Sequence, residues 1–148
     1  MITVFLADDD SDDRAFFEEA FTDLSMDIKL KSLNDGEELI STISEVITNP
    51  PPPHLVFLDL NMPRKNGFEC LSEIKNNPRF KNIPIVIIST STHSADIDRS
   101  YELGADAYIA KPNNLKDLRK LIKSVLDLKL WTNHLHLSKD QFVLSAQC

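Results

Sequence analysis

The stretch VFLDLNMP, residues 56–63, carries the pattern that decides the fold of this chain. Together with Leu55, its first three residues form an apolar run that is too short for a typical helix, so it predicts a buried β-strand. The run ends in one acid, Asp59, and Pro63 disfavours helix at the residue before it. Asp59 is therefore expected at the carboxyl end of a buried strand, where open α/β sheets place their sites. From this stretch alone, an aspartate that merely caps the loop is an equally good interpretation.

Four more short apolar segments flank this strand, at residues 3–7, 28–33, 83–88 and 107–110. Each predicted strand is followed by apolar residues at helical spacing. These helices are expected near 11–24, 35–47 and 67–76, then up to about 103, and over 115–126. Five strands that alternate with five helices predict an α/β fold: a doubly wound, five-stranded parallel sheet with right-handed crossovers and helices on both faces.

The sequence also predicts where the helices begin and end. Ser11, Asn34 and either Asn113 or Asn114 are expected N-caps, because short polar side chains accept hydrogen bonds from free N–H groups of the first turn. Gly104 suits the position after a helix end. Four prolines, residues 50–53, favour an extended segment. A rigid connector is preferred there over a proline-rich recognition motif.

Composition bounds the class of protein. The chain has 148 residues, 42% of them hydrophobic and 26% charged, which is typical of one globular domain. A net charge of −7 argues against a general nucleic-acid binder. The N-terminus lacks the basic region of a signal peptide, and no run approaches the ~18 apolar residues of a membrane span. A cytoplasmic protein that binds neither nucleic acid nor membrane is therefore expected.

Polar side chains gather where four of the predicted strands end. They are Asp8, Asp9 and Asp10 after residues 3–7, then Asp59, Ser89 and Lys111. The carboxyl ends of parallel strands share one edge of the sheet, so these side chains can converge. Clustered carboxylates repel one another unless a cation neutralises them, and oxygen ligands suit Mg²⁺. A carboxylate can accept a phosphoryl group, whose oxygens a lysine and a hydroxyl can then hold.

With these motifs in this order, residues 2–130 resemble the receiver domains of two-component response regulators. The resemblance rests on four segments: residues 8–10, residues 59–63 with Gly67, Ser89 with Thr90, and residues 104–112. It implies a flavodoxin-like fold with strand order 2-1-3-4-5. The basic turn 64–66 and the loop 77–79 resemble the subgroup of stand-alone regulators that partner phytochrome-type sensor kinases.

The resemblance implies a role for each residue at the metal site. Asp59 would be the phosphoacceptor and a ligand of Mg²⁺. Asp9 would bind Mg²⁺ directly, and Asp8 would assist through water. The backbone carbonyl of Asn61 would complete the protein ligands.

The resemblance also implies a switch. Lys111 would pair with one phosphoryl oxygen, and Ser89 would bond another after a short inward shift. Tyr108 would change rotamer as Ser89 moves, which would couple the site to the face formed by the helix that ends near 103, the strand 107–110 and the helix 115–126. That face is the expected interaction surface, and a homodimer could form through it.

The implied function is a phosphorylation-controlled signalling switch. A sensor histidine kinase or a histidine phosphotransfer protein would supply the phosphoryl group from a phosphohistidine. The protein would catalyse its own phosphorylation and slow dephosphorylation and no other reaction. We expect a receiver domain over 1–130 and a tail over 131–148, with no output domain. The tail could pack on the domain or on a partner, or fray, and Trp131 could extend the interaction surface.

Three other interpretations fit the sequence less well. Asp10, Asp12 and Asp13 fit a solvated helix N-terminus better than metal ligands, and an EF-hand loop is disfavoured because Asp13 stands where that loop needs glycine. A haloacid-dehalogenase-type phosphatase would use Asp8 as nucleophile, but the chain lacks the expected pair of late acids. A degenerate receiver that only binds partners is disfavoured by the complete set of site residues.

Overall fold

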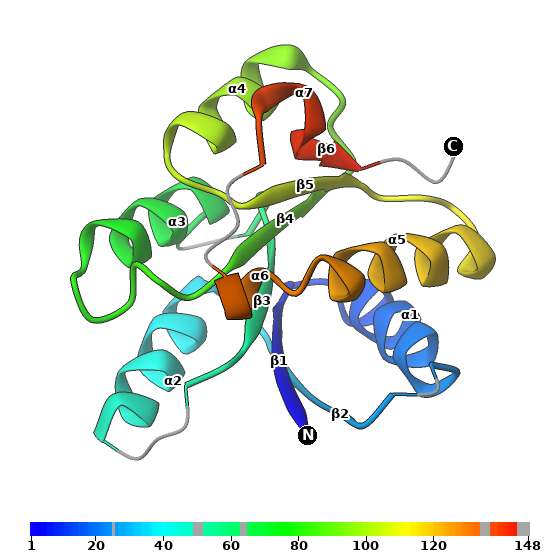
Figure 1. Ribbon diagram of the computed structural model, residues 1–148, viewed down its shortest axis with the longest axis horizontal. Coiled ribbons are helices and arrows are strands. Elements are labelled where there is room, and N and C mark those ends of the chain that lie inside the picture. The colour runs from blue at the N-terminus through cyan, green and yellow to red at the C-terminus, as the bar shows by residue number, and fades with distance from the viewer. Residues whose placement is uncertain (25, 49–51, 63–64, 134–136, 145–148) are drawn as a thin grey trace.

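The computed structural model describes residues 1–24, 26–48, 52–62, 65–133 and 137–144. Figure 1 shows one twisted sheet with helices on both of its faces. The strands are β1 (Ile2–Ala7), β2 (Ile28–Leu33), β3 (Leu55–Asp59), β4 (Ile85–Ser89), β5 (Ala107–Ala110) and β6 (Val143–Leu144). The helices are α1 (Ser11–Thr22), α2 (Gly36–Thr48), α3 (Gly67–Asn76), α4 (Ser94–Glu102), α5 (Leu115–Leu128), α6 (Leu130–Asn133) and α7 (Lys139–Phe142).

All six strands are parallel, in the order β2-β1-β3-β4-β5-β6. The predicted doubly wound sheet and the order of its first five strands are confirmed. Every residue of β3 and β4 is buried, because helices cover these central strands on both sides. In β2, at the edge of the sheet, Lys29 and Lys31 alternate with the less exposed residues and face solvent.

The two faces of the sheet carry separate hydrophobic cores. Val4 and Leu6 of β1 contribute to the core under α1 and α5, and Phe5 and Ala7 contribute to the core under α2 and α3. Successive side chains of a strand point to opposite faces, so each continuous apolar strand supplies both cores. Helices α1 and α5 lie side by side on their face (Figure 1).

Two of the predicted helix caps are wrong by one residue. Asp10, not Ser11, caps α1 and accepts hydrogen bonds from the N–H groups of the first turn. At α2 the cap bond runs from the Glu38 N–H to Asp35 rather than to Asn34. In both cases an aspartate next to the predicted cap makes the bond instead. The predicted cap Asn114 is confirmed, because its side chain accepts from the Asp117 N–H.

The sixth strand corrects the predicted five-stranded sheet. The C-terminal segment turns through α7 and places β6 beside β5, with Val143 opposite Tyr108 and Leu144 opposite Ile109. Phe142 is fully buried, with its ring centroid 5.1 Å from that of Tyr101 and 6.2 Å from that of Tyr108. Burial of this ring explains why the tail packs on the domain.

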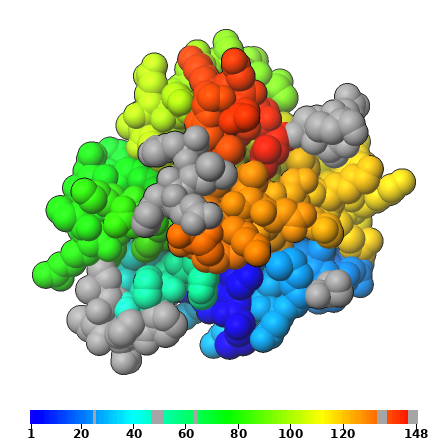
Figure 2. All heavy atoms as spheres, in the orientation of Figure 1, coloured from blue at the N-terminus to red at the C-terminus, as the bar shows by residue number. Residues whose placement is uncertain are grey.

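Figure 2 shows α7 and β6 lying against α4 and α5, over the face expected to form the interaction surface. Lys139 of α7 forms an ion pair with Asp98 of α4 at 2.9 Å. Trp131 does not extend this surface. Its ring packs edge-on against His54, which precedes β3, with the centroids 6.0 Å apart. The tail is therefore attached at two separate places.

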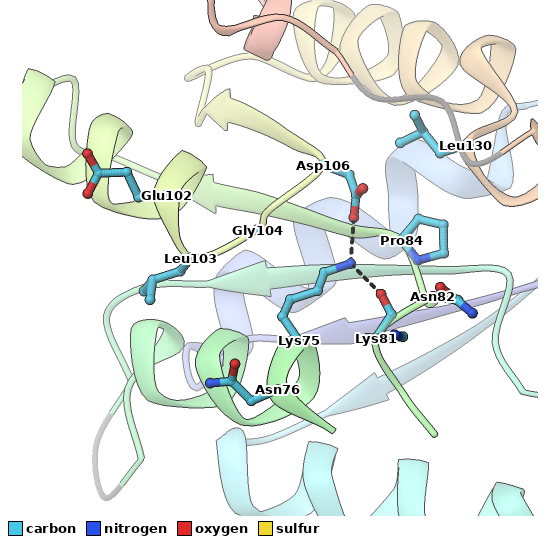
Figure 3. Close-up of a pocket in the computed structure, with 10 residues that line it drawn as sticks. All are labelled: Lys75, Asn76, Lys81, Asn82, Pro84, Glu102, Leu103, Gly104, Asp106 and Leu130. Atoms are coloured by element: carbon cyan, nitrogen blue, oxygen red, sulfur yellow. Dashed lines mark hydrogen bonds and ion pairs between the residues drawn. The ribbon is translucent and has the colours of Figure 1, made fainter. Parts of the chain in front are cut away.

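At the amino edge of the sheet, the partly buried Lys75 lies beside a hollow of about 400 Å³ (Figure 3). Its ammonium group donates to Asp106 and to the carbonyl oxygens of Lys81 and Ile83. Three acceptors match the three protons of an ammonium group, so this lysine ties α3 to the starts of β4 and β5.

Some predicted features lie outside the described residues: prolines 50–51, Pro63 with Arg64 of the basic turn, and the last residues of the tail. None of the described helices has both the length and the apolar character needed to cross a membrane.

Candidate functional site

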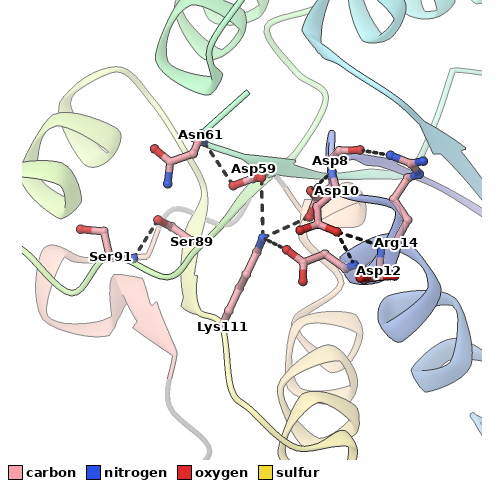
Figure 4. Close-up of polar contacts among 10 residues, drawn as sticks. Asp8, Asp10, Asp12, Arg14, Asp59, Asn61, Ser89, Ser91 and Lys111 are labelled. Carbon is pink, nitrogen blue, oxygen red and sulfur yellow. Dashed lines mark hydrogen bonds and ion pairs between the residues drawn. The ribbon is translucent and has the colours of Figure 1, made fainter. Parts of the chain in front are cut away.

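The carboxyl ends of four neighbouring strands bring the predicted site residues together (Figure 4). Asp59 is the last residue of β3 and Ser89 is the last residue of β4, while Asp8 and Lys111 directly follow β1 and β5. The Lys111 N–H donates to the Ser89 carbonyl at 2.7 Å, which fixes the start of the loop after β5. Residues up to 103 positions apart in sequence thus meet at one edge of the sheet.

Lys111 lies among three carboxylates. Its Nζ is 2.9 Å from Asp13, 3.1 Å from Asp8 and 3.6 Å from Asp59. Burial alone would lower the pKa of Lys111, but the hydrogen bond to Asp13 and the negative charges of Asp59 and Asp8 raise it. The lysine is therefore held as a cation next to the expected phosphoacceptor.

Asp59 is buried, with 4% of its surface exposed. This burial raises its pKa to about 7; Lys111 opposes the increase and the charge of Asp8 adds to it. The Asn61 N–H donates to Asp59 at 3.2 Å and holds the carboxylate in place. A buried carboxylate next to a second acid is poorly stabilised as an anion, so it favours a cation or a covalent modification.

Asp8 and Asp9 differ in exposure. Asp8 is completely buried, accepts a hydrogen bond from the Asp10 N–H at 3.0 Å, and offers its backbone carbonyl to Arg14. Asp9 is exposed at the mouth of the site. One carboxylate oxygen from each of Asp8, Asp9 and Asp59 lies within 4.8 Å of the others. Three such oxygens fit a hard divalent cation.

Gly67 brings the start of α3 against the end of β3. A Cβ atom at this position would lie 2.4 Å from the Asp59 carbonyl oxygen and 2.6 Å from the Leu60 Cα. The Gly67 N–H donates to the Leu60 carbonyl at 3.0 Å. This close backbone contact holds the start of α3 against Asp59 and Leu60.

Hydrogen bonds connect Ser89 to Tyr108. The Ser89 hydroxyl accepts from the Ser91 N–H at 3.0 Å, and the buried Tyr108 hydroxyl donates to the Ser91 carbonyl at 2.8 Å. Ser91 also donates its hydroxyl proton to Asp96 of α4 at 2.6 Å. Ser91 therefore links the residue at the end of β4 with the tyrosine of β5 and with α4.

Asp13 is the site residue that the sequence did not reveal. The expected solvated helix N-terminus is correct for Asp10, which caps α1, but the Asp13 carboxylate contacts Lys111. Its place in the first turn of α1 was one indication, because a helix that begins just after β1 starts at the same edge of the sheet as Lys111. The spacing of residues could not show that this side chain turns toward the lysine.

Comparisons with known proteins agree with this geometry. Residues 4–123 match the response regulator receiver domain. The chain is 37% identical to Response regulator Rcp1 of Synechocystis sp. over 82% of its own length and 84% of that protein. The structure of the phosphorylated cyanobacterial phytochrome response regulator RcpA is similar, with a TM-score of 0.78 and 33% identity over 92% of this chain and 97% of that one.

The Mn²⁺-bound structure of Rcp1 has a TM-score of 0.76 and 34% identity over 93% of this chain and 99% of that one. The match covers every strand end that carries a site residue. This chain therefore belongs to the response regulator receiver family of two-component signalling.

Proposed function

We propose that this receiver accepts a phosphoryl group on Asp59 and that this event switches a protein–protein interaction surface. The observation that carries the proposal is the site itself: a buried carboxylate, with a pKa raised to about 7, lies 3.6 Å from the Lys111 ammonium and beside a second buried acid. Such a group is held in place and has one cationic neighbour to balance incoming negative charge.

Each residue has a defined part in the transfer. An Asp59 oxygen attacks the phosphorus of a phosphohistidine, so that a P–O bond forms as the P–N bond breaks and the histidine nitrogen leaves. Lys111 then pairs with a phosphoryl oxygen by a charge-assisted hydrogen bond. Ser89, whose hydroxyl oxygen accepts from the Ser91 N–H, then donates its hydroxyl proton to another phosphoryl oxygen after a short inward shift.

The chemistry of the acids fits Mg²⁺, and Rcp1 has been solved with Mn²⁺. Asp9, Asp59 and the Asn61 carbonyl would bind the ion directly, and Asp8 would assist through water. The ion would offset charge in the loose transition state of phosphoryl transfer. Asp9→Asn should lower Mg²⁺ affinity by at least about tenfold, since even groups behind metal ligands commonly contribute that much. Asp12→Asn is the matched control; equal affinities of the two variants would refute this assignment.

Phosphorylation with acetyl phosphate and Mg²⁺ tests the main proposal. The wild-type protein should take up label, and Asp59→Asn should take up none. Label that persists on Asp59→Asn but vanishes on Asp8→Asn would favour the phosphatase interpretation. A folded wild-type protein without label under these conditions would indicate a receiver that only binds partners.

The interaction surface follows from the link between Ser89 and Tyr108. We infer that it comprises α4, β5 and α5 together with the docked segment α7–β6, because the buried Phe142 packs on Tyr108. A homodimer through this face would have to include or displace that segment. Analytical ultracentrifugation and a partner-binding assay, each with and without residues 131–148, test this. An unchanged oligomeric state and unchanged partner binding would make the tail dispensable.

The proposed donor is a sensor histidine kinase or a histidine phosphotransfer protein, of the phytochrome type by similarity to Rcp1 and RcpA. We further propose that the protein acts in the cytoplasm, binds no nucleic acid, and catalyses no reaction beyond gain and loss of its own phosphoryl group. Phosphotransfer profiling against purified kinases would identify the donor: rapid transfer from a phytochrome-type kinase is expected, and transfer only from unrelated kinases would contradict the subgroup assignment.

A further inference from the structure

The Lys111 ammonium group leans toward α1 rather than toward Asp59. Its contacts at 2.9 Å with Asp13 and 3.1 Å with Asp8 are within hydrogen-bonding distance, whereas Asp59 is at 3.6 Å. The lysine that should hold the phosphoryl group is thus bonded to two other carboxylates while Asp59 is unmodified.

Asp13 differs from the other two acids in its position. It belongs to the first turn of α1 and its side chain is 40% exposed, whereas those of Asp8 and Asp59 are at most 6% exposed. It lies outside the group of acids that could share a cation. Its contact with Lys111 therefore serves neither metal binding nor phosphoryl acceptance.

Two physical effects of Asp13 act in the same direction. Its carboxylate accepts a hydrogen bond from one of the three N–H groups of the Lys111 ammonium, so a phosphoryl oxygen must compete for that donor. Its negative charge also lies 2.9 Å from the Lys111 ammonium group, where it offsets the positive charge offered to the phosphoryl group.

We propose that Asp13 is a positioning residue that restrains Lys111 and weakens the hold of the protein on a phosphoryl group. The inference rests on the proposed function, because it assumes that Lys111 pairs with a phosphoryl group on Asp59. It adds a residue of α1 that sets the affinity of the site without touching the transferred group.

Beryllofluoride, which mimics a phosphoryl group, provides the test as an equilibrium measurement. With saturating Mg²⁺, Asp13→Asn should bind beryllofluoride about two- to fivefold more tightly than the wild type, as expected for release of a partly exposed ion pair. Asp12→Asn removes the same charge from the same helical turn, yet its affinity should stay near that of the wild type. Equal increases in beryllofluoride affinity in both variants would show that the effect comes from net charge alone and would overturn the proposal.

A double-mutant cycle separates restraint of the lysine from a general effect on folding. In a Lys111→Ala background, Asp13→Asn should gain much less affinity, because no ammonium group remains to be released. A gain as large as in the wild-type background would overturn the proposal, as would weaker or unchanged binding in the single variant. Urea unfolding of each variant establishes that the fold is intact.

The two levels of the hypothesis fail in different ways. A folded wild-type protein that binds no beryllofluoride and takes no label on Asp59 would refute the proposed function, and this inference with it. A wild-type protein that binds and is labelled, but whose Asp13→Asn variant binds no more tightly, would refute this inference alone.

Discussion

At the scale of single residues, the ionisation of Asp59 connects stability with function. The carboxyl group is buried beside Asp8, and its pKa of about 7 means that a large fraction is protonated at neutral pH. Ionisation of this group destabilises the folded protein, because it places a negative charge in a buried site beside Asp8. A bound cation or a phosphoryl group on Asp59 would remove that cost. The folded protein is therefore least stable when Asp59 is ionised and no metal is bound.

This conflict predicts a pH-dependent stability difference. In the unfolded chain Asp59 ionises near its ordinary pKa of 3.8, but in the folded chain it does so near 7. The wild type should therefore lose stability as pH rises between these values, and the loss should persist above pH 7. In metal-free buffer Asp59→Asn should be more stable at pH 8 by on the order of 1–3 kcal/mol, and by less at pH 5.

Urea unfolding at the two pH values measures this difference. Saturating Mg²⁺ provides the control, because binding to the folded wild type should shrink the advantage of the variant. An advantage that did not grow with pH would contradict the assigned pKa.

The sequence predicted most site residues because each follows its own strand in a fixed order. Asp59, Ser89 and Lys111 could be placed at one edge once the strands were placed. Asp13 could not, because its contact with a lysine 98 residues away depends on the direction of a side chain. The Asn61 carbonyl as a metal ligand stays a prediction.

At the scale of elements, the junction between β3 and α3 is held by a close backbone contact and a helix cap. Gly67 allows the helix to begin in contact with the backbone of Asp59 and Leu60. Asn66 caps the same helix, and Glu69 completes a capping box with it. The cap and the glycine together fix the start of α3 against the end of β3.

Replacement of Gly67 should therefore affect stability and phosphorylation together. In Gly67→Ala the new Cβ would overlap backbone atoms, which cannot turn aside as a flexible side chain can. We expect a loss of about 1–3 kcal/mol, typical of overpacking and strain in a core, with slower labelling of Asp59. Urea unfolding and acetyl phosphate labelling measure the two effects. Ser72→Ala, on the same helix, is the control, and equal behaviour of both variants would show that the junction can relax.

Elements were predictable where a strong pattern defined them. Residues 107–110 and 67–76 form the strand and the helix expected from the sequence. The misplaced caps arose where two suitable polar residues stand side by side. Residue type alone cannot decide between Asp10 and Ser11 as the N-cap, because the choice depends on which residue takes the extended backbone at the helix start.

At the scale of the whole molecule, the C-terminal segment completes the core. Phe142 is buried with Tyr101 and Tyr108, although the strand that follows it has only two residues. A strand this short gives no recognisable periodicity, so the sequence predicted five strands and left the tail open. Tertiary contact, not local propensity, places the tail.

Removal of the Phe142 ring should destabilise the protein. Phe142→Ala should lower the free energy of unfolding by about 3 kcal/mol, the usual range for a buried phenylalanine, and loosening of the tail would limit the loss. Val143→Ala alters a neighbour that is 39% exposed and should cost less than about 0.5 kcal/mol. Urea titration compares the two variants; losses of equal size would show that Phe142 is not an anchor.

The short sixth strand also bears on colloidal behaviour. An apolar strand whose edge is unpaired is a template for pairing with another chain, and natural proteins cover or shorten such edges. Here β6 pairs with Tyr108 and Ile109, the two central residues of β5, and becomes the short outer strand at this edge of the sheet. The tail thus protects the sheet from edge-to-edge aggregation, and preparations that lack it should precipitate at lower protein concentration than the full chain.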